Sequence, residues 1–169
     1  MEQNTINSWE TKTTVKKGNI GEKIAQSYLE RKGFIVYRPN TPGSHPFDNL
    51  CANDKNIFVA EIKTKEARKY YADTGVDIRH YDKYLYIKKT HNVKVYIIFV
   101  DAYNAKIYGN ELNELIKPIT VNGKNYPSKE GGIIYFPLVN MIIIANLTKE
   151  QCDEISGYNT KQYNGATKI

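Results

Sequence analysis

The sequence predicts an α/β protein whose core elements follow the order αβββαβ. Three observations support this class. Residues 17–32 carry apolar side chains three and four positions apart, which is helical spacing. Residues 47–52 and 57–64 are short apolar runs separated by polar turn residues, the pattern of a β-hairpin. Residues 93–100, VKVYIIFV, form a nearly continuous apolar run that favours a buried central strand.

The first expected helix carries an acid at the margin of its apolar stripe. Ile20, Ile24 and Tyr28 form this stripe at four-residue spacing, and Leu29 widens it. At a helical turn of about 100° per residue, Glu22 lies about 20° from Leu29. We therefore expect Glu22 to be half buried against the sheet. The alternative interpretation is an acid that simply favours the positive end of a helix.

The remaining core elements are a strand over residues 34–38 and a second helix over residues 77–90. A Thr74-Gly75 break is expected just before that helix. The threonine-rich residues 11–15 are expected to form an edge strand or an ordered arm.

The predicted hairpin has a register that the turn determines. Asn53 to Asn56 are turn residues, and a two-residue and a four-residue loop give the same pairing. That pairing places Asp48 directly opposite Glu61, and opposed residues have Cβ atoms about 4.5–5.5 Å apart on one face of the sheet. Lys63 lies two residues after Glu61 and shares this face.

Two facing carboxylates are unfavourable unless a positive charge lies between them. Mg²⁺ takes oxygen ligands and is commonly held by one or two carboxylates together with substrate phosphate. A lysine beside such a site can hold or deprotonate a water molecule, or stabilise negative charge on phosphorus. The alternative interpretation is that Lys63 only neutralises Asp48 and Glu61 on a solvated face.

Two segments resemble a known family. The HPFD of residues 45–48 and the EIK of residues 61–63 resemble the PD-(D/E)XK nuclease superfamily, which has the restriction-endonuclease-like fold. The upstream segment GNIGEKIAQSYLERKGFIVYRP is similar to the GxxGE-type first helix of archaeal-type Holliday junction resolvases and related nucleases. The resemblance covers residues 17–101. One departure is that Phe47 separates the proline from Asp48.

The resemblance implies a mixed central sheet flanked by helices. It also implies that Asp48 and Glu61 bind Mg²⁺ or Mn²⁺, with the Ile62 backbone carbonyl as a further candidate ligand. Lys63 would assist the attacking water, and Glu22 would approach the metal from the first helix.

Several basic and aromatic residues near this site are candidate DNA contacts, because such residues suit phosphate binding and base stacking. They are His45, Lys65, Arg68, Lys69, Tyr70 and Lys83. For residues 65–71 the alternative is a lid that packs its tyrosines on the protein. Lys83 is equally explained by a solvated helix face, and His45 by hydrogen bonds within its loop.

Composition agrees with a nucleic-acid substrate. The net charge is +6, and residues 1–94 carry all of the excess, with 17 Lys and Arg against 11 Asp and Glu. A basic half that contains the candidate site suits a polyanion, although a merely soluble basic surface is the alternative. No signal peptide or membrane span is evident, so we expect a cytoplasmic protein whose two cysteines are reduced and which needs no small-molecule cofactor.

The chain is expected to form one domain of 169 residues, with the core over 17–101, an extension over 102–157 and a polar tail over 158–169. In the extension we expect a strand over residues 105–108 and a short helix over residues 111–116. We also expect a C-terminal β-hairpin from residues 133–136 and 141–145, and a helix capped by Thr148 that ends near residue 156. The extension would either form a homodimer or shape substrate choice.

Together these inferences predict a Mg²⁺-dependent endonuclease that hydrolyses phosphodiester bonds in DNA, with a junction-resolvase-like structure preference as its specific form. An RNA-cutting nuclease is a further alternative, and it differs from the predicted enzyme only in its substrate. The alternative from another class is a catalytically silent nucleic-acid-binding or protein-interaction module on the same fold.

Overall fold

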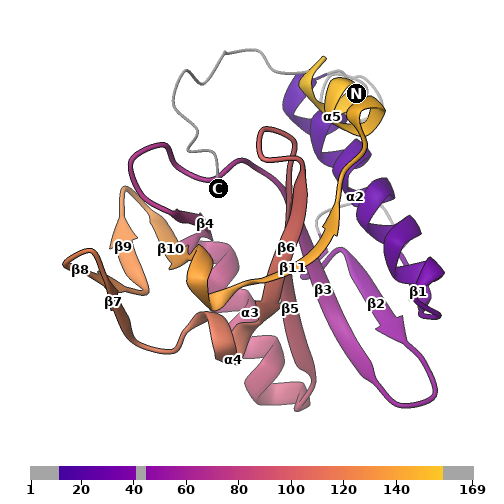
Figure 1. Cartoon of the computed structure of the whole chain (residues 1–169). Coiled ribbons are helices and arrows are strands. Elements are labelled where there is room, and N and C mark those ends of the chain that lie inside the picture. Colours follow the sequence, from indigo (N-terminus) through magenta and orange to yellow (C-terminus); the bar gives the residue numbers. More distant parts are fainter. Residues whose placement is uncertain (1–11, 41–44, 158–169) are drawn as a thin grey trace, which may run out of the picture.

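A six-stranded mixed sheet forms the centre of the protein, with the strand order β1-β2-β3-β5-β6-β11 (Figure 1). The computed structural model describes residues 12–40 and 45–157 of the chain. The sheet strands are β1 (Ile35–Tyr37), β2 (Asn49–Ala52), β3 (Ile57–Thr64), β5 (Lys94–Asp101), β6 (Lys106–Glu111) and β11 (Ile142–Asn146). The adjacent β3 and β5 are parallel, and every other neighbouring pair is antiparallel.

Smaller elements surround this sheet. A three-stranded sheet has the order β4-β10-β9, and β7 pairs with β8. Their strands are β4 (Asp73–Asp77), β7 (Ile119–Val121), β8 (Lys124–Tyr126), β9 (Ser128–Glu130) and β10 (Ile133–Pro137). The helices are α2 (Thr13–Arg31), α3 (Ile78–His91), α4 (Leu112–Leu115) and α5 (Lys149–Ser156), with one 3₁₀ turn, η1 (Leu138–Asn140).

The predicted αβββαβ order is confirmed by α2, β1, β2, β3, α3 and β5. The predicted mixed sheet flanked by helices is confirmed as well. The parallel pairing of β3 and β5 needs a crossover connection, and α3 supplies it. This connection carries the chain across one face of the sheet, where α3 contacts β5.

Helices cover both faces of the sheet. On one face, α2 and α5 contact each other and pack against a cluster that includes Ala25, Leu29 and Ile155. On the other face, α3 packs with the three-stranded sheet around Tyr81, Tyr84 and Phe136. Figure 1 shows α2 and α5 on one side of the central sheet and α3 on the other. The two faces are therefore available for separate chemistry.

The first helix begins earlier than the sequence predicted. It starts at Thr13, so residues 13–15 are helical and do not form an edge strand or arm. Their β-branched side chains favour strands only weakly, and the packing of the helix outweighs that preference. Residues 1–11, the loop residues 41–44 and the tail 158–169 lie outside the described residues.

The expected Thr74-Gly75 break is wrong, because both residues belong to β4. Gly75 faces Tyr135 in the ladder between β4 and β10. A Cβ atom on Gly75 would lie 2.2 Å from the Ile134 carbonyl oxygen, so the glycine serves a close approach between two strands. Strand β4 was not predicted because its partner comes from residues about sixty positions later.

The expected C-terminal hairpin is also wrong, although both of its segments are strands. Strand β10 pairs with β4 and β9, whereas β11 pairs with β6 at the edge of the central sheet. The intervening η1 turn leads the chain from one sheet to the other. The strand and short helix predicted before residue 116 are confirmed as β6 and α4.

The helix capped by Thr148 is confirmed as α5, with a reciprocal capping box between Thr148 and Gln151. Both cysteines are free thiols, as predicted, and Cys51 is buried. Among the helices of residues 12–40 and 45–157, none has the length and apolar composition needed to cross a membrane.

Candidate active site

The predicted hairpin register is confirmed. Strands β2 and β3 pair Asn49 with Ala60 and Ala52 with Ile57. The Asn53 amide donates to the Asn56 carbonyl at 2.9 Å, which closes the turn. Continuing the same register by one step places Asp48 opposite Glu61, just beyond the last paired residues.

Asp48 lies immediately before β2 and binds the neighbouring strand through its side chain. Its Oδ2 accepts a hydrogen bond from the backbone N–H of Ile62 at 2.7 Å. The carboxylate therefore takes the position of a carbonyl acceptor at the end of the ladder. This contact holds Asp48 beside Glu61 on β3.

Glu61 is buried, with 6 % of its surface exposed. Lys63, two residues later on the same face, places its Nζ 2.5 Å from Glu61 Oε1. The hydroxyl of Tyr84 on α3 donates a second hydrogen bond to the Glu61 carboxylate. Glu61 is thus held from its own strand and from the helix that covers it.

Burial and the charge of Glu61 both act on Asp48. Burial raises the pKa of Asp48 from 3.8 to about 7, and the negative charge of Glu61 adds to this rise. The Ile62 N–H bond and the positive charge of Lys63 oppose the rise in this pKa. A low-dielectric site with two adjacent carboxylates favours a bound proton or a bound cation.

Glu22 approaches the same acids from α2, because the helix lies very close to the end of β3. A Cβ atom on Gly21 would lie 1.9 Å from Thr64 Oγ1, so only glycine fits at this contact. The Thr64 hydroxyl donates to the Gly18 carbonyl at 3.4 Å. These contacts bring the first turns of α2 against the strand that carries Glu61.

The environment of Glu22 is half buried, as predicted, with 19 % of the side chain exposed. Arg38 binds its Oε2 at 2.5 Å. Burial raises the pKa of Glu22, Arg38 opposes this rise, and the charge of Glu61 adds to it. Glu22, Asp48 and Glu61 therefore belong to one electrostatic cluster.

Two residues of α3 that lie near the site, Tyr84 and His80, were not predicted from the sequence. Tyr84 is 2 % exposed and contacts Glu61, whereas the predicted candidate on this helix, Lys83, is exposed. His80 lies one turn earlier, and burial and the charge of Lys63 lower its pKa. A tyrosine in the apolar stripe was the available signal, because a buried hydroxyl needs a polar partner.

Arg68 is part of a buried ion-pair network. Its Nε and Nη2 bind the two oxygens of Asp73 at 2.6 and 2.7 Å, and its guanidinium lies 3.6 Å from the centre of the Tyr135 ring. Asp73 is fully buried and also accepts from Tyr126. These contacts favour the packed-lid interpretation for Arg68, and its contact with DNA stays a prediction.

The other candidate DNA contacts differ in exposure. Lys65 donates to the Gly75 carbonyl at 3.0 Å, and burial lowers its pKa. Tyr70 is 83 % exposed, and the Lys69 ammonium lies 5.4 Å from the centre of its ring. His45 is half buried in the loop before Asp48. Of these residues, Lys69 and Tyr70 are the most exposed to a large ligand.

The donor set fits a hard divalent cation. Asp48 and Glu61 supply carboxylate oxygens, and the backbone of Ile62, the residue directly after Glu61, supplies a carbonyl. Within residues 12–40 and 45–157, no three His, Cys, Asp or Glu side chains converge closely enough to hold a metal. Glu22 therefore stands outside a common coordination sphere with Asp48 and Glu61.

A solved structure has the same fold. It is the Holliday junction resolvase Hjc from Archaeoglobus fulgidus, which is 13 % identical, with a TM-score of 0.52. The match covers 73 % of this chain and 90 % of the resolvase. No protein-family model and no curated protein matches the chain. The similarity confirms the predicted restriction-endonuclease-like fold.

Proposed function

We propose that this protein is a Mg²⁺-dependent endonuclease that hydrolyses phosphodiester bonds in DNA. The observation that carries the proposal is the pairing of Asp48 and Glu61 at the end of the β2–β3 ladder, with Lys63 bound to Glu61. The raised pKa of Asp48 supports it, because this site favours added positive charge. The fold shared with a resolvase structure supports the reaction class.

Each residue has a distinct role in this proposal. Asp48, Glu61 and the Ile62 carbonyl would hold Mg²⁺ or Mn²⁺. When bound, the ion would supply Lewis acidity and an acidified water. Lys63 has its Nζ beside Glu61 and would orient the attacking water or donate to a phosphate oxygen.

Two further groups would support the reaction. Glu22 has a raised pKa and would accept a proton from water or from a water chain at the edge of the site. Tyr84 would act as a positioning residue, because its hydroxyl holds the Glu61 carboxylate from α3. Preorganised carboxylates avoid a reorganisation cost during the reaction.

Substrate binding would use the basic surface around the site. Lys69, Tyr70 and Lys83 are exposed and would contact phosphate or stack on bases, and His45 would approach from its loop. We propose DNA as the substrate, with a branched junction as the preferred form. The cytoplasmic location and a homodimer stay predictions.

One observation favours the silent-module alternative. Lys63 neutralises Glu61 directly, so this acid already has a cationic partner within the chain. Such a protein would bind nucleic acid or another protein through the same basic surface without hydrolysis. The two functions differ in whether divalent metal produces cut products.

Cleavage of a mixed panel tests the proposal. Labelled junction, flap, duplex and single-stranded DNA, with one RNA, would be incubated with Mg²⁺, Mn²⁺ or EDTA. We expect metal-dependent cutting that falls by about 10²–10⁴-fold in Glu61→Gln and Lys63→Ala. The matched control is Glu114→Gln, which changes an exposed acid on α4. Salt-sensitive binding without any cutting would instead favour the silent module.

A further inference from the structure

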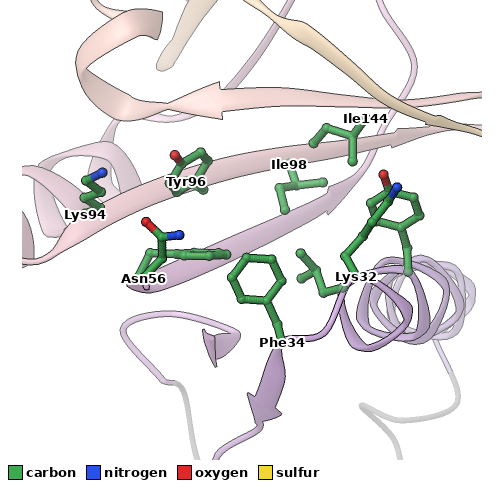
Figure 2. Close-up of a pocket in the computed structure, with 10 residues that line it drawn as sticks. Lys32, Phe34, Asn56, Lys94, Tyr96, Ile98 and Ile144 are labelled. Carbon is green, nitrogen blue, oxygen red and sulfur yellow. The ribbon is translucent and has the colours of Figure 1, made fainter. Parts of the chain in front are cut away.

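A pocket lies on the face of the sheet covered by α2. Its volume is about 440 Å³, which is within the range of pockets that bind small molecules. Figure 2 shows its walls, which come from the end of α2 and from β3, β5 and β11. Phe58 lines this pocket, and it alternates with Val59 of the opposite cluster. The pocket and Glu61 therefore lie on opposite faces of β3.

Aromatic rings form the floor of this pocket. The rings of Phe34 and Phe58 are 5.2 Å apart at an interplanar angle of 75°, and those of Phe58 and Tyr96 are 4.7 Å apart. Phe34 and Tyr96 are partly exposed, so their rings remain accessible from the pocket. Flat aromatic ligands stack on such surfaces, and every nucleobase has a suitable π-face.

The polar groups of the pocket are cationic or neutral. Lys32 and Lys94 are exposed and lie at opposite ends of the view, with Phe34 and Ile98 between them (Figure 2). None of the described residues that line the pocket is acidic. Within the described residues, neither lysine forms a salt bridge, and Lys32 lies 5.5 Å from the centre of the Tyr28 ring.

Two further observations concern the polar groups that a ligand would meet in the pocket. The Asn56 side chain lines the pocket, and its amide can both donate to and accept from the edge of a base. Glu111 pairs with Tyr96 across the β5–β6 ladder but does not line the pocket. The pocket therefore combines an aromatic floor, an amide and two cations that have no acidic partner among the described residues.

We propose that this pocket binds one nucleotide of a single-stranded nucleic acid. The base would lie against Phe34 and Tyr96, and the phosphates on either side of it would contact Lys32 and Lys94. Cations at both ends suit a base with a phosphate on each side, because each phosphate then has its own ammonium group. This site would act independently of Glu61, so it would hold a strand whether or not the protein cleaves it.

Metal-free binding of a short labelled oligothymidylate tests the proposal by fluorescence anisotropy in EDTA. We expect the double variant Lys32→Glu with Lys94→Glu to bind at least tenfold more weakly than the wild type. For this variant, the slope of log affinity against log salt concentration should be less steep by about 1.4, because two phosphate contacts on a single strand are lost. The matched control is Lys129→Glu, an exposed charge reversal on β9 that should leave the salt dependence nearly unchanged.

Photocrosslinking locates the strand. An oligonucleotide that carries 5-iodouracil should crosslink to peptides containing Phe34 or Tyr96, and the crosslink should persist in Glu61→Ala. Unchanged affinity in the double lysine variant, or crosslinks only to other peptides, would overturn the proposal. Displacement of the strand by equimolar thymidine monophosphate would also overturn it, because the ligand would then be a free nucleotide. Loss of cleavage in Glu61→Ala tests only the nuclease function.

Discussion

Replacement of Gly21 by alanine should weaken the contact that brings α2 to the active-site strand. The new Cβ atom would lie 1.9 Å from Thr64 Oγ1 and 3.0 Å from both Thr64 Cβ and Cγ2. The strand or the helix must therefore move. Overpacking of this kind costs about 1–3 kcal/mol, whereas alanine gains about 1 kcal/mol over glycine inside a helix. We expect a net loss of about 0–2 kcal/mol.

Gly18 provides a matched control one turn earlier on the same helix. A Cβ atom at Gly18 meets nothing within 4 Å, so Gly18→Ala should only gain helix propensity. It should stabilise the protein by about 1 kcal/mol, which raises Tm by about 2–4 °C in a chain of this size. The free energies of unfolding of the two variants should therefore change in opposite directions or differ by at least about 1 kcal/mol.

The assay is urea unfolding of both variants, followed by circular dichroism, with cleavage measured in parallel. Cleavage should fall in Gly21→Ala beyond any loss of folded protein, because Glu22 moves away from Asp48 and Glu61. Thr64→Ala should recover part of the stability of Gly21→Ala, since it removes the closest atom. Equal stability of the two alanine variants, or no recovery with Thr64→Ala, would refute the close contact between α2 and β3.

Three further predictions concern single groups. The pKa of Asp48 in the folded protein lies above 3.8, so protonation of Asp48 stabilises the fold fully below pH 3.8, and this stabilisation is lost as the pH rises through about 7. Asp48→Asn should therefore raise Tm in EDTA more at pH 8 than at pH 4. Tyr84→Phe should lower kcat with little change in substrate Kd, because it removes the hydroxyl that holds Glu61, and an unchanged kcat would contradict that role. Asp73→Asn should lower the free energy of unfolding by about 3–5 kcal/mol because it leaves buried charge unpaired, whereas Glu130→Gln changes an exposed partner of Arg68 and should cost much less; similar losses in denaturant titrations of the two would argue against a buried network.

Local patterns predicted most of the acidic cluster. The turn at Asn53 to Asn56 determined the hairpin register, so the proximity of Asp48 and Glu61 followed from counting residues. The alternation of a strand placed Lys63 on the same face, and helical periodicity placed Glu22 at the edge of a buried stripe. These inferences succeeded because each depends on residues within one element or one turn.

Contacts between segments far apart in the sequence determined the features of the fold and the site that local patterns did not predict. Strand β4 exists because β10 supplies its partner, and residues 73–77 alone show no unambiguous strand pattern. The fold, and not the sequence, brings Arg68 to Asp73 and Tyr135. Tyr84 reaches Glu61 only because the crossover helix packs on the face of the sheet that carries Glu61. The sequence by itself determined the register and periodicity of single elements, whereas the tertiary structure determined which buried polar groups became partners, because burial and pairing depend on how separate elements pack.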